Sequence, residues 1–170
     1  MKSMLDLKNT LVGTLRENYS EKYQDHLLKQ YEIFLQSAEK ISDRRQNMNI
    51  FFLSINTGLV GLMGYLNLLN KNTIIAFLNL LPINFAGIIL CFIWYQILCF
   101  YKGLNESKYL IIHEIEKDLP LRPYKAEWVC TGEGKDPKKY KPFTDAEVFM
   151  PGVFFLLHLI VLIESIPLGN

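Results

Sequence analysis

The chain has 170 residues, half of them hydrophobic, and its 18 lysines and arginines nearly balance its 17 aspartates and glutamates. This length is that of one domain, and the charge balance excludes a strong global attraction to nucleic acid. The charges are unevenly spread, however, because no Lys, Arg, Asp or Glu occurs in 46–70, 72–101 or 148–163. Uncharged stretches that alternate with charged ones are typical of membrane spans.

Residues 1–48 are predicted to form cytoplasmic N-terminal helices. Between Ser20 and Met48 the apolar positions recur every three or four residues, broken only by Arg45, and they are Leu27, Tyr31, Phe34, Ala38, Ile41 and Met48. This spacing indicates a coiled-coil stripe, which either pairs with another helix or folds back on its own chain. The stretch from Ser20 to Thr57 contains neither Pro nor Gly, so the helix is able to continue into the first span.

Three membrane-spanning helices are predicted, over 49–69, 74–101 and 147–167. The first two uncharged windows exceed the roughly 20 apolar residues that a span requires, whereas a buried soluble helix of this size normally shows a charged face. The third window becomes a full span if Glu164 reaches the lipid headgroups. The sequence therefore predicts an all-α integral membrane protein.

Small and polar residues mark the first span. Gly58, Gly61 and Gly64 allow helices to approach closely, and Asn56 is polar within the bilayer. Such an asparagine either joins helices by hydrogen bonds or binds a transported ligand. The choice between these two roles stays open at this point.

The second and third spans carry further unusual residues. Pro82 predicts a kink or break in the second span, where Asn79 or Asn84 would serve the freed carbonyl. Trp94, with Tyr95 and Tyr101, is expected at the membrane interface. In the third span, His158 either marks an ion path or bonds to a neighbouring helix. The candidate pore or inter-helix polar residues are thus Asn56, Asn84 and His158.

Residues 102–146 are predicted to form a cytoplasmic helix and a loop. Leu104, Ile111, Ile115 and Leu119 share one face of an amphipathic helix that ends at Pro120, and the N-terminal stripe is its expected partner. The segment from 121 to 143 is rich in Pro, Gly and Lys and is predicted to be irregular but docked. Its lysines favour anionic lipid headgroups over a nucleotide, because the Walker spacing and a preceding strand are missing.

The sequence contains no recognisable catalytic, cofactor or metal motif. The three histidines are isolated, no nucleophile motif is present, and Cys91, Cys99 and Cys130 lack metal or disulfide spacing. We therefore expect a protein that is not an enzyme, with no cofactor, no metal and no nucleic-acid partner. Membrane lipids and an unknown cytoplasmic protein are the expected partners besides the chain itself.

Basic residues predict the orientation of the spans. Lys40, Arg44 and Arg45 precede the first span, Lys102 and Lys108 follow the second, and the turn between these spans offers only Lys71. By the positive-inside rule the N-terminus is cytoplasmic and the C-terminus lies outside.

Three segments carry a resemblance to a known family. They are "ISDRRQNMNIFFLSINT" (41–57), "LNESKYLIIHEIEKDLPLRPYKAEW" (104–128) and "GEGKDPKKYKPFTDAEVFMP" (132–151). Over residues 25–160 the chain resembles the RipA family of bacterial octameric membrane proteins. The resemblance implies a homo-octamer of the bacterial cytoplasmic (inner) membrane that is linked to fitness under stress, without an established catalytic activity. Positions that match its motifs are candidates for assembly or a cytoplasmic surface: Arg44, Arg45, Asn105, Lys108, Glu114, Glu127 and Trp128.

Two functional hypotheses follow. In the first, the protein is a non-enzymatic scaffold or regulator of the envelope. In the second, it is an oligomeric ion channel or a membrane effector, for instance in antiphage defence, with a pore lined by Asn56, Asn84 or His158. Three spans enclose no aqueous path alone, so the channel hypothesis requires the oligomer.

Overall fold

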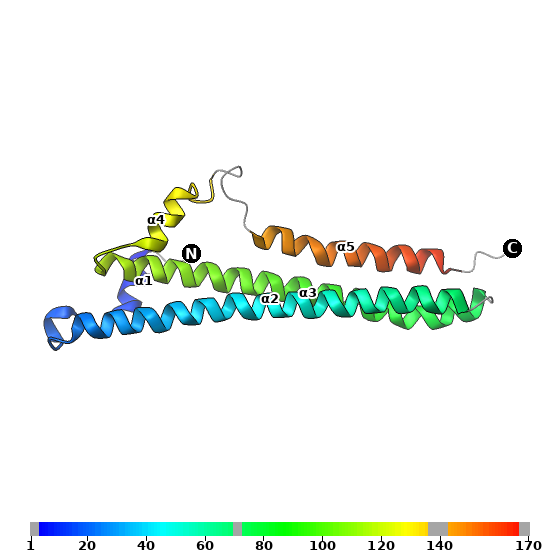
Figure 1. Cartoon of the computed structure of the whole chain (residues 1–170), viewed down its shortest axis with the longest axis horizontal. Helices are drawn as coiled ribbons and strands as arrows, with labels where there is room; N and C mark the ends of the chain where they lie inside the picture. The colour runs from blue at the N-terminus through cyan, green and yellow to red at the C-terminus, as the bar shows by residue number, and fades with distance from the viewer. Residues whose placement is uncertain (1–3, 70–72, 136–142, 167–170) are drawn as a thin grey trace. The chain divides into compact units, whose positions relative to one another are not determined.

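The computed structural model describes residues 4–69, 73–135 and 143–166, and every regular element in these ranges is a helix. The elements in chain order are α1 (Met4–Leu11), η1 (Arg16–Asn18), α2 (Tyr23–Leu69), α3 (Thr73–Ile115), η2 (Glu116–Asp118), α4 (Pro123–Cys130) and α5 (Phe143–Glu164) (Figure 1). Three of them, α2, α3 and α5, contain stretches long and apolar enough to cross a membrane. The predicted all-α fold with three spans is confirmed.

The chain divides into two compact units. The charged unit consists of Met1–Asp43 and Gly103–Lys141, and the membrane unit consists of Arg44–Lys102 and Pro142–Asn170. Both long helices contribute to both units. Helix α2 is uninterrupted because it lacks proline and its first glycine is Gly58, inside the span, where the bilayer favours internal backbone hydrogen bonds.

The core of the charged unit lies between α2 and α3. Tyr31 and Ala38 of α2 pack against Ile112 of α3, and Phe34 and Ile115 are among the residues around them. The predicted pairing of the N-terminal stripe with the apolar face of 104–119 is therefore present within one chain. The stripe folds back on its own chain, as one of the two alternatives predicted.

The core of the membrane unit is an aromatic cluster. Phe52, Trp94 and Leu98 are buried together, with Val148 and Phe154 of α5 packed against them. Within the membrane unit, the buried residues of the described part of α3 recur every three or four positions and are Leu80, Asn84, Gly87, Cys91, Trp94 and Leu98. Trp94 is only 1% exposed, so its ring packs against protein rather than lipid. Its predicted position at the level of the membrane interface stays a prediction.

The predicted break at Pro82 is absent, because α3 continues through this residue to Ile115. The cytoplasmic helix of 104–119 is accordingly the last part of α3 followed by η2. Asn84 donates its Nδ2–H to the Leu80 carbonyl at 3.1 Å, whereas Pro82 frees the carbonyl of Leu78, four residues earlier. The alternative of a kink at Pro82 stays a prediction.

The segment after Pro120 is not irregular throughout, because Pro123–Cys130 forms α4. Proline fits the first position of a helix, where its missing N–H would have no partner in any case. The prediction of a loop was wrong here because Pro123 was interpreted as a loop signal rather than as a helix start.

Candidate functional site

A buried polar cluster joins all three spans of the membrane unit. Asn56 of α2 and His158 of α5 are both 0% exposed, and Cys91 of α3 is buried between them in the same network. The Cys91 thiol donates to Asn56 Oδ1 at 3.3 Å, and His158 Nε2 lies 3.3 Å from that same oxygen. Asn56 Nδ2–H donates to the Phe52 carbonyl at 2.9 Å, so one amide side chain connects three helices.

The hydrogen bonds of this cluster define the state of His158. An amide oxygen accepts but never donates, so the Nε2 that faces Asn56 must carry the proton. In the neutral ring Nδ1 is then an acceptor, and it is buried without a hydrogen-bond partner among the described residues. An acceptor that is buried without a partner lowers the free energy of unfolding. Only the Nε2 side of the His158 ring is therefore stabilised by a hydrogen bond.

Gly87 makes room for His158. A Cβ built on Gly87 would overlap the imidazole ring, whereas a Cβ on Gly58, Gly61 or Gly64 would meet nothing within 4 Å. The close approach of helices inside the protomer therefore occurs at Gly87, and the three glycines of the first span face open space. Sequence reasoning missed Gly87, although its spacing of four from Cys91 on an apolar helix was a usable signal.

Trp94 continues the contact between the spans. Its indole Nε1–H donates to Asn49 Oδ1 at 3.0 Å. The ring stacks on Phe52 with a centroid distance of 5.9 Å and an interplanar angle of 9°, and its centroid lies 6.1 Å from that of Phe154. Helices α2, α3 and α5 thus meet at aromatic rings as well as at polar groups.

A half-buried ion pair links α2 to the start of α5. Arg45 Nε lies 3.4 Å from Glu147 Oε2, and the two side chains are 15% and 6% exposed. Glu147 belongs to the first turns of α5, where the helix dipole favours a negative charge. This contact therefore positions α5 against the first span at the end of the membrane unit.

The charged unit has its own buried polar centre at Glu116, which is 0% exposed. Glu116 Oε1 accepts the Tyr31 hydroxyl at 2.9 Å and the Tyr124 amide at 3.0 Å, and Oε2 accepts the Lys125 amide at 2.9 Å. These two amides belong to the first turn of α4, so Glu116 caps α4 from outside that helix. Burial, followed by the hydrogen bond and charge of Glu116, raises the pKa of Tyr31.

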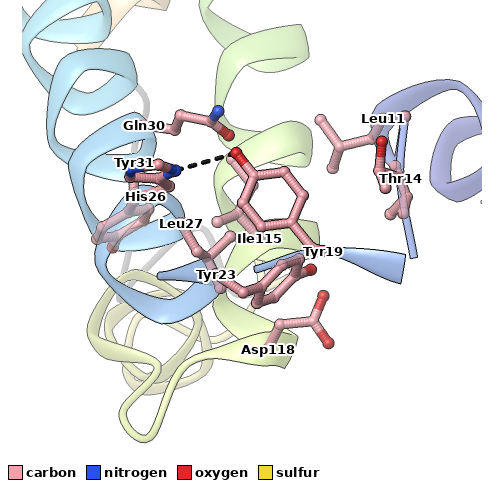
Figure 2. A pocket seen from close by; sticks show the side chains of 12 residues that line it. Leu11, Thr14, Tyr19, Tyr23, His26, Leu27, Gln30, Tyr31, Ile115 and Asp118 are labelled. Carbon is pink, nitrogen blue, oxygen red and sulfur yellow. Dashed lines mark hydrogen bonds between the residues drawn. The ribbon is translucent and has the colours of Figure 1, made fainter. Parts of the chain in front are cut away.

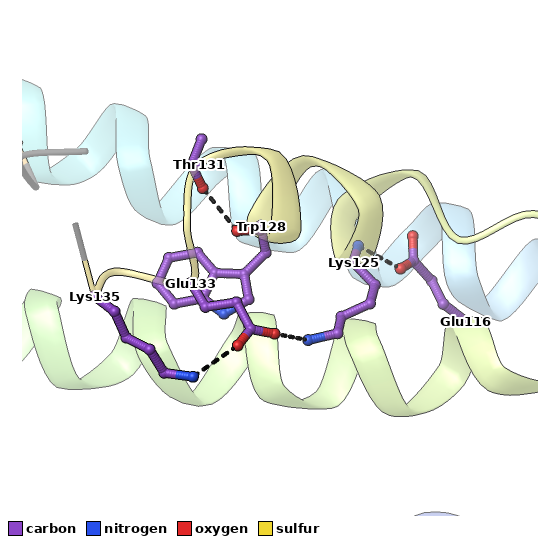
Figure 3. A network of polar contacts seen from close by, with 6 residues as sticks. All are labelled: Glu116, Lys125, Trp128, Thr131, Glu133 and Lys135. Atoms are coloured by element: carbon purple, nitrogen blue, oxygen red, sulfur yellow. Dashed lines mark hydrogen bonds and ion pairs between the residues drawn. The ribbon is translucent and has the colours of Figure 1, made fainter. Parts of the chain in front are cut away.

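A tight loop follows α4, and Glu133 fastens it (Figure 3). The Glu133 carboxylate contacts Lys125 Nζ at 2.9 Å and Lys135 Nζ at 3.0 Å. The hydrogen bond from Lys125, and then that from Lys135, lowers the pKa of Glu133 to about 2. These two lysines are thus paired within the chain, while the other lysines predicted to attract lipid headgroups, from 138 to 141, lie outside the described residues.

The backbone of this loop is left-handed over three residues, with φ of 80° at Gly132, 53° at Glu133 and 71° at Gly134. Glycine adopts this conformation readily, which explains two of the three positions. The Glu133 amide and the Thr131 hydroxyl both donate to the Trp128 carbonyl at 2.9 Å, and the Trp128 ring lies against Gly134. The loop is therefore held on α4 by backbone and side-chain contacts together.

A family profile matches residues 28–167 and is described as the octameric membrane protein family (8xMP). The chain belongs to this family. No curated protein and no solved structure matches the chain. The family match contains both buried polar centres and all three spans, but it excludes α1, η1 and the first turn of α2.

The predicted polar residues of the spans have different surroundings. The structure brings Asn56 and His158 together, as described above. Asn84 is also fully buried on α3, but its Oδ1 has no hydrogen-bond partner in the described part of the chain. All three predicted residues are therefore inside the protomer.

The predicted assembly residues are mostly engaged within the chain. Lys108 bonds to the Ser37 hydroxyl and lies 4.1 Å from the centroid of the Phe34 ring, and Glu114 pairs with Lys117 at 2.5 Å. Arg45 and Trp128 make the contacts already given, and the Oδ1 of Asn105 is buried without a hydrogen bond among the described residues. Arg44 and Glu127 alone of the seven are exposed.

Proposed function

We propose that the chain is a non-enzymatic subunit of a homo-octamer in the bacterial cytoplasmic membrane, where it acts as a scaffold or regulator linked to envelope and stress fitness. The family description supports the octamer, and the resemblance to RipA supports the location and the role. The observation that carries the scaffold is the complete burial of Asn56, Asn84 and His158 within one protomer. Asn56 and His158 join helices, and none of the three residues is exposed on the surface of the protomer to line a pore.

The open face of α2 is the proposed contact between subunits. Gly58, Gly61 and Gly64 are exposed there, and the hydroxyls of Ser54 and Thr57 bond to carbonyls of their own helix at 2.8 Å. Helices in a bilayer associate by close packing of such small residues, because lipid provides no hydrophobic driving force between them. A second copy of the chain is therefore the occupant that fits this face.

The charged unit is proposed to lie in the cytoplasm, following the basic residues on either side of the spans. It carries a surface for a protein partner on α4 and the turn before it. Leu121 and Val129 are 78% and 54% exposed there, beside the exposed Glu127. Exposed apolar side chains with a neighbouring charge are typical of a binding surface.

The channel hypothesis is less well supported by these contacts. A pore lined by Asn56, Asn84 and His158 requires the three spans to separate. That movement would break the bond between Asn56 and His158 and the packing of Gly87 against the ring. The stacked rings of Phe52 and Trp94 would separate as well.

Ion flux from liposomes tests the two functions directly. Purified protein is reconstituted and its mass is measured by native mass spectrometry, with wild type, Asn56→Leu and His158→Leu compared at equal protein content. The scaffold proposal expects an octamer whose flux equals that of empty liposomes. Flux through wild type that either substitution abolishes, at unchanged octamer mass, would overturn the proposal and establish a channel.

Photo-crosslinking tests the proposed partner surface. A photoreactive residue at Val129 is expected to crosslink a second protein in cells, and the same residue at the exposed Glu39 of α2 is the matched control. Equal crosslinking from both positions, or none from Val129, contradicts a specific surface on α4.

A further inference from the structure

A cavity of about 320 Å³ lies in the charged unit, and Tyr31, which bonds to Glu116, is one of its lining residues. Its walls are the segment from Leu11 to Thr14, the residues around Tyr19, the start of α2 and the end of α3 (Figure 2). This volume is at the lower end of the range for small-molecule pockets, so the cavity has room for a small ligand.

The charge on the cavity wall is negative. Asp118 is a lining residue, and in the described part of the chain no lysine or arginine lines the cavity. Figure 2 shows the Asp118 carboxylate projecting from its ribbon toward Tyr23.

Aromatic rings also line the cavity. The ring centroids of Tyr19 and Tyr23 are 5.6 Å apart at an interplanar angle of 78°, and those of Tyr19 and His26 are 5.8 Å apart at 85°. The Tyr19 hydroxyl and His26 Nδ1 are 2.9 Å apart, so their hydrogen bond fixes the two rings relative to each other. Aromatic cages, in which several ring faces surround the cation, are the usual sites for alkylated ammonium groups.

We propose that this cavity binds a small organic cation of the substituted ammonium class. The Asp118 carboxylate is the counter-ion, and the faces of Tyr19 and Tyr23 contact the alkylated nitrogen. An anion finds no lysine or arginine on the described wall. A purely apolar ligand would desolvate Asp118 and Gln30 without a bond in return.

The site is built largely by the part of the chain that the family profile leaves out. Tyr19, Tyr23 and His26 precede residue 28, where the match begins. The proposed site therefore lies largely outside the matched region, and it stands independently of the scaffold or channel.

Calorimetry with two probes of equal shape tests the proposal. The full-length protein in detergent is titrated with choline and with 3,3-dimethylbutan-1-ol, which replaces the charged nitrogen of choline by carbon. Choline is expected to bind saturably, and the uncharged probe at least roughly tenfold more weakly. Equal binding of both probes refutes cation recognition, as does absence of binding by both choline and tetramethylammonium.

Substitutions identify the groups that bind the cation. Asp118→Asn and Tyr23→Leu are each expected to weaken choline binding roughly tenfold, while Tyr23→Phe retains the ring and most of the affinity. Asp43→Asn makes the same charge change at an exposed position of α2 that does not line the cavity, so its affinity should equal that of wild type. An unchanged oligomer mass shows that each variant is folded, and unchanged affinity in Asp118→Asn overturns the proposal.

Discussion

Glu116 in the charged unit and His158 in the membrane unit are both fully buried, but their hydrogen-bonding groups are satisfied to different extents. Glu116 in the charged unit accepts three hydrogen bonds at 2.9–3.0 Å, two of them from backbone amides. His158 in the membrane unit makes one contact at 3.3 Å and leaves Nδ1 unpaired in the described structure. The first arrangement orders the backbone of another helix, whereas the second mainly holds helices side by side. A saturated polar centre specifies one conformation more strongly than a partly paired one.

The largest effect is expected from Glu116→Ala, because it leaves the Tyr31 hydroxyl and two amides of α4 without their acceptor. Leaving a buried hydrogen-bond donor without its acceptor typically costs about 1–3 kcal/mol for each donor. Hydrogen exchange over residues 120–135 should rise sharply, and the thermal midpoint in detergent should fall. Glu127→Ala, at an exposed position of α4, is the control. Protection of α4 equal in both variants would show that Glu116 does not cap this helix.

The next effect is expected from Gly87→Ala in the membrane unit. The added methyl group overlaps the His158 ring, and overpacking of a core costs about 1–3 kcal/mol. Thermal unfolding in detergent measures the loss, with Gly61→Ala as a control at an open position. The double variant with His158→Ala should recover part of the stability, since the clash is then removed. If the stability losses of the two single variants simply add in the double variant, a direct contact between residue 87 and the His158 ring is contradicted.

A smaller effect on the protomer is expected from Gly58→Leu, which adds bulk to the open face of α2. Helix content and thermal midpoint should stay close to those of wild type, because nothing inside the protomer is displaced. The oligomer should instead dissociate, because the added side chain prevents the close packing of helices at this face. Native mass spectrometry distinguishes the dissociated protomer from the oligomer. An intact octamer would place the subunit contact elsewhere.

The smallest effect concerns pH and the loop after α4. The pKa of Glu133 is lowered from the ordinary value of 4.5 to about 2, so its ion pairs stabilise the loop above pH 4.5 and are lost as the pH falls toward 2. The change should be small because the pairs are exposed. The chain has two tryptophans, so in a Trp94→Phe background the fluorescence of Trp128 reports on this loop. Glu133→Gln should remove the pH dependence in this window, and a dependence that persists would assign it to another group.

The sequence predicted the features that depend on local pattern. Uncharged stretches identified the three spans, because crossing a bilayer requires about 20 apolar residues. The stripe of Tyr31, Phe34 and Ala38 predicted the seam of the charged unit. Asn56 and His158 were recognised individually as polar residues of the spans. Their contact was not predictable, since they are 102 positions apart and only the packing of α2 and α5 brings them together.

Other features depend on tertiary structure more completely. Glu116 looked like one of several charges on an amphipathic helix, and only the fold surrounds it with donors. Gly87 looked unremarkable beside the three glycines of the first span, although it is the one that a side chain contacts. The rule that predicts Trp94 at the interface did not predict that the seam of α3 buries its ring. Rules for single residues fail where a neighbouring helix decides the environment.

The capping of α4 by Glu116 has a consequence for the order of folding. With eight residues, α4 is far shorter than a helix that is stable in isolation. Its first turn depends on a carboxylate at the end of α3, which in turn is held by the Tyr31 hydroxyl of α2. During synthesis we therefore expect α4 to form only after α2 and the end of α3 have docked. The formation of α4 then shows that α2 and α3 have packed against each other.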